Sequence, residues 1–193
     1  MVLPLNDWVL AIKKTLKHPK ANEDARIKFQ KKINDFSKQG KTIIYLDESG
    51  FAKDMPRTHG YCRKGQRCYG HQDWHAKGRI NVIGAIVGFT FLTVSLFEGN
   101  INSDTFYAWL KQDLLPKVKP DSVLVMDNAT FHKRQDMITA IQDKGVILEF
   151  LPPYSPDLNP IEKKWAQAKS IRKKLRCDDI DFLFQEYFNY VKL

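Results

Sequence analysis

Two hydrophobic periods alternate along the chain, which predicts a mixed α/β fold. Short β-branched and aromatic runs are typical of buried strands, and stretches with apolar residues every three or four positions are typical of helices packed on a core. The predicted strands cover 42–47, 80–87, 91–97, 122–127 and 146–151, and the predicted helices cover 22–36, 103–115, 130–144, a stretch from 159, and 178–193. After the first helix this order predicts a mixed five-stranded sheet with helices on both faces.

Proline and glycine mark where these elements end. Ser103 or Asp104 is suited to cap its helix, and Pro116 is expected to stop it. Gly145 is expected to close the next helix as a C-terminal cap. Three prolines within 152–156 stiffen the loop before the last long helix, because proline fixes φ and biases the preceding residue away from helix. We expect this loop to position that helix.

The length of 193 residues suits one domain of ordinary size. We predict a helical lead-in segment over 1–40 and a main domain over 41–176 that carries a basic hairpin insertion at 53–79. A C-terminal helix over 177–193 is expected to pack on this domain. Its aromatic residues are typical of a core or of a subunit contact.

The charge of the chain favours polyanionic partners. Lys and Arg number 31 against 22 Asp and Glu, a formal net charge of +9, and nucleic acid is the first candidate because phosphate contacts release counterions. Seven of the basic residues lie in 53–79 and seven in 159–176. For the run 171–176 a plain solvated face is an equally open interpretation. The predicted DNA contacts are Arg57, Arg63, Lys64, Arg67, Lys77, Lys163, Lys169, Arg172 and Lys173.

The cysteines and the apolar stretches predict an intracellular protein. Three cysteines and no secretory leader make a disulfide framework improbable, and polar residues interrupt the longest apolar stretch, so no membrane span is predicted. We expect a cytoplasmic, nucleoid-associated location. His59, Cys62, Cys68 and His71 are ligand types that zinc accepts, but the two cysteines are more widely spaced than in common zinc sites. A DNA-gripping hairpin is the favoured interpretation of this segment.

Three acidic residues carry the candidate chemistry. Asp47 follows the apolar run 42–46, Asp127 follows 122–126, and Glu162 opens the helical stretch after the proline loop. A carboxylate at the carboxyl end of a buried strand is well placed for a ligand. Two such carboxylates side by side repel each other unless a divalent cation lies between them. The trio therefore indicates magnesium or manganese.

Each of these residues also has a structural interpretation. Asp47 and Asp127, taken singly, could cap neighbouring turns at the strand ends. Asn159 and Glu162 fit the N-cap and N3 positions of a capping box, a role that is compatible with metal binding because the helix dipole favours an ionised carboxylate. Glu48 is expected to point to the opposite face from Asp47, since side chains alternate along a strand. It is therefore left out of the ligand set.

The three acidic segments match a known family. Residues 43–51 read IIYLDESGF, 123–129 read VLVMDNA, and 151–162 read LPPYSPDLNPIE. Thirty-four residues separate Asp127 from Glu162. In these segments and in this spacing the chain resembles transposases of the mariner superfamily, and within it the bacterial insertion-sequence branch.

The resemblance covers about 41–174 and implies a ribonuclease-H-like fold, which the order of elements also matches. It implies a DDE transposase that cuts DNA at transposon ends and joins them to target DNA at a TA dinucleotide, with Asp47, Asp127 and Glu162 as catalytic ligands of two Mg²⁺ or Mn²⁺ ions. Asn128 and His132 would be auxiliary residues that orient water or contact the scissile phosphate.

The resemblance also implies partners and leaves two alternatives. Such enzymes work as homodimers on paired ends. An N-terminal helix-turn-helix region commonly recognises those ends, and only residues 1–40 precede the first catalytic strand here, so a separate helix-turn-helix product is a further expected partner. The alternatives are a nuclease of the same fold without strand transfer and a non-catalytic DNA-binding remnant. Strand-transfer products distinguish the transposase from the nuclease, and metal affinity distinguishes both from the remnant.

Overall fold

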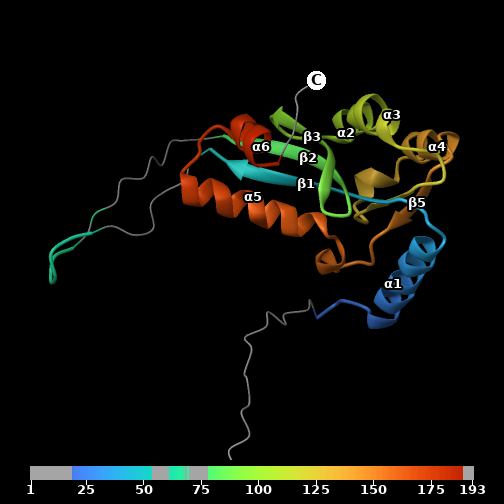
Figure 1. Cartoon of the computed structure of the whole chain (residues 1–193), viewed down its shortest axis with the longest axis horizontal. Helices are drawn as coiled ribbons and strands as arrows, with labels where there is room; N and C mark the ends of the chain where they lie inside the picture. The colour runs from blue at the N-terminus through green and yellow to red at the C-terminus, as the bar shows by residue number, and fades with distance from the viewer. Residues whose placement is uncertain (1–18, 54–60, 68, 70–77, 189–193) are drawn as a thin grey trace, which may run out of the picture.

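The computed structural model describes residues 19–53, 61–67, 69 and 78–188, and its strands form one sheet (Figure 1). The spatial order of the strands is β3-β2-β1-β4-β5. The first three pair antiparallel, whereas β4 pairs parallel with both β1 and β5. The strands are β1 (Ile43–Ala52), β2 (Arg79–Val87), β3 (Thr90–Glu98), β4 (Val123–Met126) and β5 (Ile147–Phe150). The predicted mixed five-stranded sheet is confirmed.

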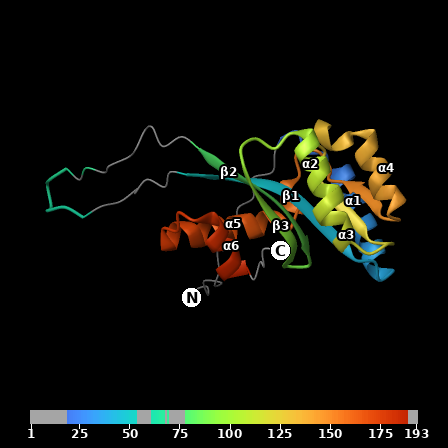
Figure 2. The same cartoon turned by 90° about the horizontal axis from the view of Figure 1, so that it is seen from above.

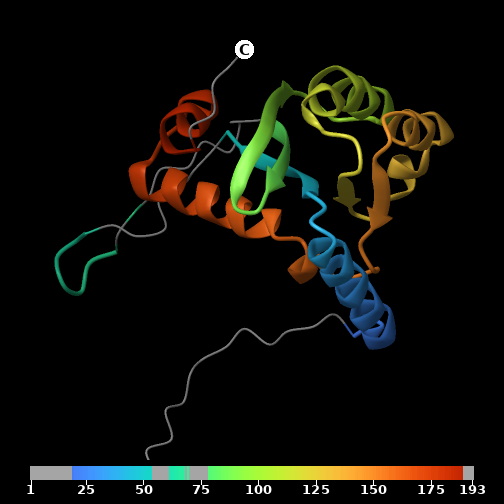
Figure 3. The ribbon, with the colours of Figure 1, turned by 45° about the vertical axis from the view of Figure 1, so that its right-hand side comes forward.

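Helices cover both faces of this sheet, as Figure 2 and Figure 3 show. The α-helices are α1 (Glu23–Lys38), α2 (Ser103–Trp109), α3 (Leu115–Lys117), α4 (Gln135–Asp143), α5 (Ile161–Leu175) and α6 (Ile180–Phe188). A π-helical turn, η1 (Leu110–Leu114), joins α2 to α3, and the 3-10 turns are η2 (Thr130–Lys133) and η3 (Pro156–Leu158). Among the described helices, none has both the length and the apolar character that a membrane span requires.

Alternation along β1 separates two hydrophobic cores. Leu46 points to the face covered by α2 and α4, where it packs with Phe106 and Leu124. Phe51 points to the face covered by α5 and α6, where it packs with Phe184. Because side chains alternate, Asp47 shares the face of Phe51 and Glu48 shares the face of Leu46.

The lead-in helix α1 packs on the sheet. Asn22 caps it by accepting a hydrogen bond from the Ala25 N–H, and its apolar side packs on the β4 and β5 side of the sheet. Arg26 is buried and donates two hydrogen bonds, of 2.8 and 2.6 Å, to the Asp157 carboxylate in η3. Such a two-pronged pair fixes geometry as well as charge. The described part of the predicted 1–40 segment is therefore tied to the proline loop.

The first predicted strand is longer than expected. Its parallel pairing with β4 stops at Tyr45 and Val125, but its antiparallel pairing with β2 continues to Ala52. Asp47 therefore lies within β1, just beyond the point at which the parallel partner leaves it. The prediction that Asp47 ends its strand is wrong, because the pairing with β2 keeps the chain extended through Gly50.

Three predicted helix boundaries also differ. Asn102, rather than Ser103 or Asp104, caps α2, and the helical stretch continues past Pro116 to Lys117. Pro116 lies in the first turn of α3, where proline is tolerated. The helix predicted over 130–144 begins at Gln135, because η2 and an extended Arg134 come first. Gly145, with φ 73°, follows the end of α4 as predicted.

Candidate active site

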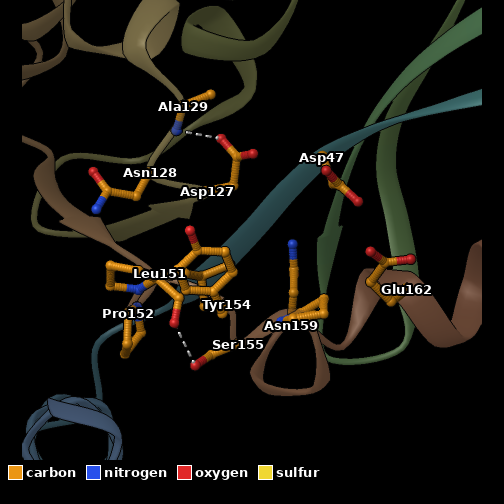
Figure 4. A pocket seen from close by; sticks show the side chains of 12 residues that line it. Asp47, Asp127, Asn128, Ala129, Leu151, Pro152, Tyr154, Ser155, Asn159 and Glu162 are labelled. Carbon is orange, nitrogen blue, oxygen red and sulfur yellow. Dashed lines mark hydrogen bonds between the residues drawn. The ribbon is translucent and has the colours of Figure 1, made fainter. Parts of the chain in front are cut away.

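Three carboxylates from separate elements line one cavity of about 350 Å³. Asp47 comes from β1, Asp127 directly follows β4, and Glu162 lies in the first turn of α5. Figure 4 shows the three carboxylates facing the same space. The proline loop and Asn128 form the remaining walls. The structure thus brings together the acidic residues that the sequence singled out from positions far apart in the chain.

Asp127 is held by a hydrogen-bond network. Its Oδ1 accepts a hydrogen bond from the Ala129 N–H at 3.0 Å and lies 2.6 Å from Nδ1 of His132. The other ring nitrogen of His132 lies 3.0 Å from Oε1 of Glu48, and the His132 side chain is 1% exposed. His132 therefore bridges a carboxylate beside the cavity and a carboxylate on the other face of β1.

The pKa values around this bridge favour ion pairing. Burial by itself raises the pKa of Asp127, but the hydrogen bonds from His132 and the Ala129 N–H outweigh burial and hold this pKa below its usual value. Burial lowers the pKa of His132, whereas its hydrogen bonds to Asp127 and Glu48 raise that pKa to about 9. At neutral pH the ring is therefore protonated and donates to both carboxylates.

Asp47 lies in a different environment. Trp165 Nε1 donates a hydrogen bond of 3.2 Å to its Oδ2. Burial raises the pKa of Asp47 to about 8, and the negative charges of Glu162, Glu48 and Asp127 act in the same direction. In the absence of a cation this carboxyl group therefore keeps its proton at neutral pH.

A glycine in β2 makes room for the tryptophan. Gly84 pairs with Asp47 across the two strands, and a Cβ atom at Gly84 would lie 2.7 Å from the Trp165 ring. Only a residue without a side chain lets Trp165, which is 1% exposed, lie against β2. This packing holds Trp165 where it donates its hydrogen bond to Asp47.

The predicted capping box at the start of α5 does not form. α5 begins at Ile161 after Pro160, and no side chain caps it. The side chain of Asn159 instead donates from Nδ2 to the Leu46 carbonyl oxygen at 3.3 Å. Its Oδ1 is buried and has no hydrogen-bond partner among the described residues. Asn159 therefore ties the loop to β1 beside Asp47, a contact that the helix-start pattern concealed.

The donor atoms around the cavity suit a hard divalent cation. Carboxylate and carboxamide side chains line it. Within the described ranges no three His, Cys, Asp or Glu side chains converge closely enough to surround one ion. Magnesium usually keeps several waters and takes only one or two protein carboxylates together with substrate phosphates. The spread of the three carboxylates around an open cavity fits that mode.

The predicted DNA contacts fall into three groups. Lys163, Lys169 and Lys173 are exposed on α5, and Arg63, Lys64 and Arg67 are exposed in a segment that stands clear of the sheet (Figure 2). Arg57 and Lys77 lie outside the described residues. The prediction for Arg172 is wrong. Arg172 is 5% exposed, and its guanidinium donates to the carbonyl oxygens of Ala52 and Cys177, so it holds the end of α5 to β1.

The zinc pattern stays a prediction. His59, Cys68 and His71 lie outside the described residues, and Cys62 is exposed.

The contact between Glu48 and His132 was not predicted from the sequence. Two signals pointed to it: strand alternation placed Glu48 on the face opposite Asp47, and His132 follows Asp127 by five residues.

Comparisons with known proteins agree with this geometry. A Mos1 transposase paired-end complex with the left transposon end matches 95% of this chain with a TM-score of 0.69 and 15% identity. A Mos1 mariner paired-end complex with Mn matches with a TM-score of 0.66 and 16% identity, again over 95% of this chain. The chain spans 60% of the length of each of these two proteins. The catalytic domain of Mos1 mariner transposase matches with a TM-score of 0.61 and 12% identity, and 92% of this chain covers 86% of that domain.

These likenesses show the fold, and the predicted ribonuclease-H-like architecture is confirmed. No curated protein matches the chain in sequence. A family profile described as DDE superfamily endonuclease matches residues 42–183, a stretch that includes all three acidic residues. The chain therefore belongs to the DDE superfamily of endonucleases.

Proposed function

We propose that this chain is the catalytic domain of a transposase that cuts DNA at transposon ends and joins the freed 3′-hydroxyl to target DNA. The observation that carries the proposal is the single cavity lined by Asp47, Asp127 and Glu162 within a DDE endonuclease fold. Structures named as Mos1 paired-end and strand transfer complexes share this fold, which supports transposition over other endonuclease reactions.

Asp47, Asp127 and Glu162 would hold two Mg²⁺ or Mn²⁺ ions. When bound, such ions activate the attacking hydroxyl and stabilise the leaving oxygen of a phosphoryl transfer. Similar folds in complexes named with Mg and with Mn support this choice of metal. In the chain itself, His132 and the Ala129 N–H both contact Oδ1 of Asp127, which leaves Oδ2 directed to the cavity for a ligand.

The remaining residues of the cavity position substrate. Asn128 lines it beside Asp127 and has a carboxamide suited to orient water or to contact a phosphate oxygen. Asn159 keeps the loop against β1, so that Glu162 stays close to Asp47. Exposed lysines on α5, Lys163 and Lys173, continue from Glu162 along the helix and provide phosphate contacts.

DNA is the proposed partner, as transposon ends and as a target at a TA dinucleotide. We propose a homodimer that brings two ends together, a separate helix-turn-helix product that recognises them, and a location on the nucleoid in the cytoplasm. The net charge of +9 and the exposed basic segment around Arg63, Lys64 and Arg67 support a nucleic-acid partner.

The test is a cleavage and joining assay on a labelled, pre-cut DNA end with Mg²⁺ or Mn²⁺. The wild type is compared with Asp127→Ala and with Asp143→Ala, which removes an exposed acid at the end of α4. We expect joined products from the wild type and from Asp143→Ala, and none from Asp127→Ala. Hydrolysis without joining would instead indicate a nuclease. DNA binding without products and without metal dependence would indicate a non-catalytic remnant.

A further inference from the structure

Tyr154 is the one bulky side chain in the proline loop that lines the cavity while remaining half exposed. It lies between Pro153 and Ser155, and its relative exposure is 50%. Figure 4 shows it among the residues that line the cavity, which include Asp127 and Asn159. An aromatic ring at the wall of a phosphoryl-transfer cavity meets whatever part of the substrate extends beyond the reacting phosphate.

The backbone of Tyr154 is strained. Its φ is 56°, a left-handed conformation that a residue with a large side chain rarely adopts. Glycine and asparagine take this conformation more readily. Such strain persists only where the surroundings impose it, and it concentrates at functional sites. Tyrosine is more strained in this conformation than glycine or asparagine would be in the same turn, which indicates that the ring itself has a function.

The surroundings hold the backbone of Tyr154 in place. Prolines at 152, 153 and 156 restrict the backbone on both sides of Tyr154. Ser155 is buried, and its hydroxyl donates to the Pro153 carbonyl oxygen at 3.2 Å, which closes the turn around Tyr154. The ring is therefore carried by a rigid turn, and the entropy cost of using it to bind a ligand is low.

We propose that Tyr154 is a stacking subsite for an unpaired nucleobase next to the reacting phosphate, an inference that rests on the proposed function. The carboxylates and their cations would take the phosphate, and the apolar ring with its neighbouring prolines would take the flat base. Every base has a π-face, so such a subsite tolerates any sequence. A base within a duplex is covered by its neighbours, so the ligand is a nucleotide that has left the stack.

The test measures binding without requiring cleavage. A fluorescein-labelled oligonucleotide of six thymidines is titrated in Ca²⁺ by fluorescence anisotropy, together with an oligonucleotide that has the same phosphates and abasic residues throughout. The variants are Tyr154→Asn, which removes the ring but tolerates the left-handed backbone, and Tyr154→Phe, which keeps the ring. Phe89→Asn is the control, because Phe89 is an exposed aromatic residue in the turn between β2 and β3.

We expect Tyr154→Asn to weaken binding of the thymidine oligonucleotide about tenfold and to leave binding of the abasic one unchanged. Tyr154→Phe and Phe89→Asn should bind both as the wild type does. Equal losses on both oligonucleotides would overturn the inference in favour of a phosphate contact. A loss in Tyr154→Phe as large as in Tyr154→Asn would assign the effect to the hydroxyl group.

The inference also fails if the wild type does not prefer the thymidine oligonucleotide to the abasic one. Its failure is distinct from that of the proposed function. A chain that binds bases through Tyr154 but forms no joined products contradicts transposition alone. If the wild type joins DNA ends and Tyr154→Asn binds the thymidine oligonucleotide as tightly as the wild type, only the stacking subsite is contradicted.

Discussion

The two aspartates of the cavity lie in opposite electrostatic surroundings. Asp127 accepts hydrogen bonds from a protonated His132 and a backbone N–H, and its pKa is lowered. Asp47 accepts one from Trp165, faces other carboxylates, and has a pKa raised by burial to about 8. The Asp127 carboxylate is therefore ionised and oriented by the protein alone, whereas Asp47 requires an external positive charge to be ionised at neutral pH. A cation held beside Asp47 would lower the pKa of Asp47 and favour its ionised form.

Asp47→Asn should give the largest effect. It removes a carboxylate that we propose as a metal ligand, and we expect cleavage to fall by about 10³-fold, the equivalent of several kcal/mol of transition-state stabilisation. In metal-free protein the same change should alter the pH dependence of stability. Because the folded pKa of Asp47 is raised, the folded state binds a proton that the unfolded state releases, so stability falls as pH rises from about 4 to about 8.

Urea unfolding of the metal-free protein at about pH 5 and about pH 6.5 measures this dependence, since the raised pKa of His132 affects stability only above its unfolded value of about 6.5. The wild type should lose stability between the two pH values, and Asp47→Asn should lose less. Mg²⁺ at neutral pH should raise the unfolding midpoint of the wild type more than that of the variant. Equal pH slopes for both proteins would contradict the contrast between the aspartates.

His132→Ala should have the next largest effect, because it removes the bridge that orients Asp127. Loss of a residue that supports a metal ligand typically costs about 10- to 100-fold in metal affinity or activity. The Mn²⁺ affinity, measured by electron paramagnetic resonance, and the rate of DNA cleavage should each decrease by a factor in that range. Lys133→Ala, an exposed neighbour in η2, is the control and should match the wild type. Unchanged Mn²⁺ affinity would show that the bridge does not organise the site.

Glu48→Gln should have the smallest effect. The amide keeps an oxygen that accepts from His132 Nε2 but loses the charge, and we expect a loss of about 1 kcal/mol, or about fivefold in cleavage rate. Cleavage kinetics of Glu48→Gln beside Asp47→Asn measure the difference. A loss as large as that of Asp47→Asn would mean that Glu48 binds the cation directly, which its place on the opposite face of β1 argues against.

Much of this arrangement could be predicted from the sequence because it is local. The β-branched runs, the order of strands and helices along the chain and the three acidic segments each depend on residues close together in the chain, and the cavity combines the acidic residues as expected. The positions of Gly145 after α4 and of Gly88 in the turn between β2 and β3 follow from the ease with which glycine adopts a positive φ. The placement of Glu48 follows from strand alternation, a rule that needs no knowledge of the rest of the fold.

The differences have a common cause, which is that a distant partner outweighs a local preference. Asn159 has the sequence context of an N-cap, but it bonds to Leu46, which lies 113 positions earlier. Arg172 belongs to a basic run, but the carbonyl oxygens of Ala52 and Cys177 hold it inside. The helix after Asp127 starts late because His132 is held between Asp127 and Glu48. The distant partners among these, Leu46, Ala52 and Glu48, cannot be identified from the neighbouring residues.

The ion pair of Arg26 and Asp157 connects helix α1 to the proline loop. Arg26 is buried in α1, and Asp157 belongs to the loop that carries Tyr154, Asn159 and the start of α5. A partner that bound α1 and preferred one arrangement of this loop would shift the loop toward that arrangement. By reciprocity, DNA seated in the cavity must change the affinity for that partner by the same factor. The buried arginine therefore links α1 directly to the loop that lines the cavity.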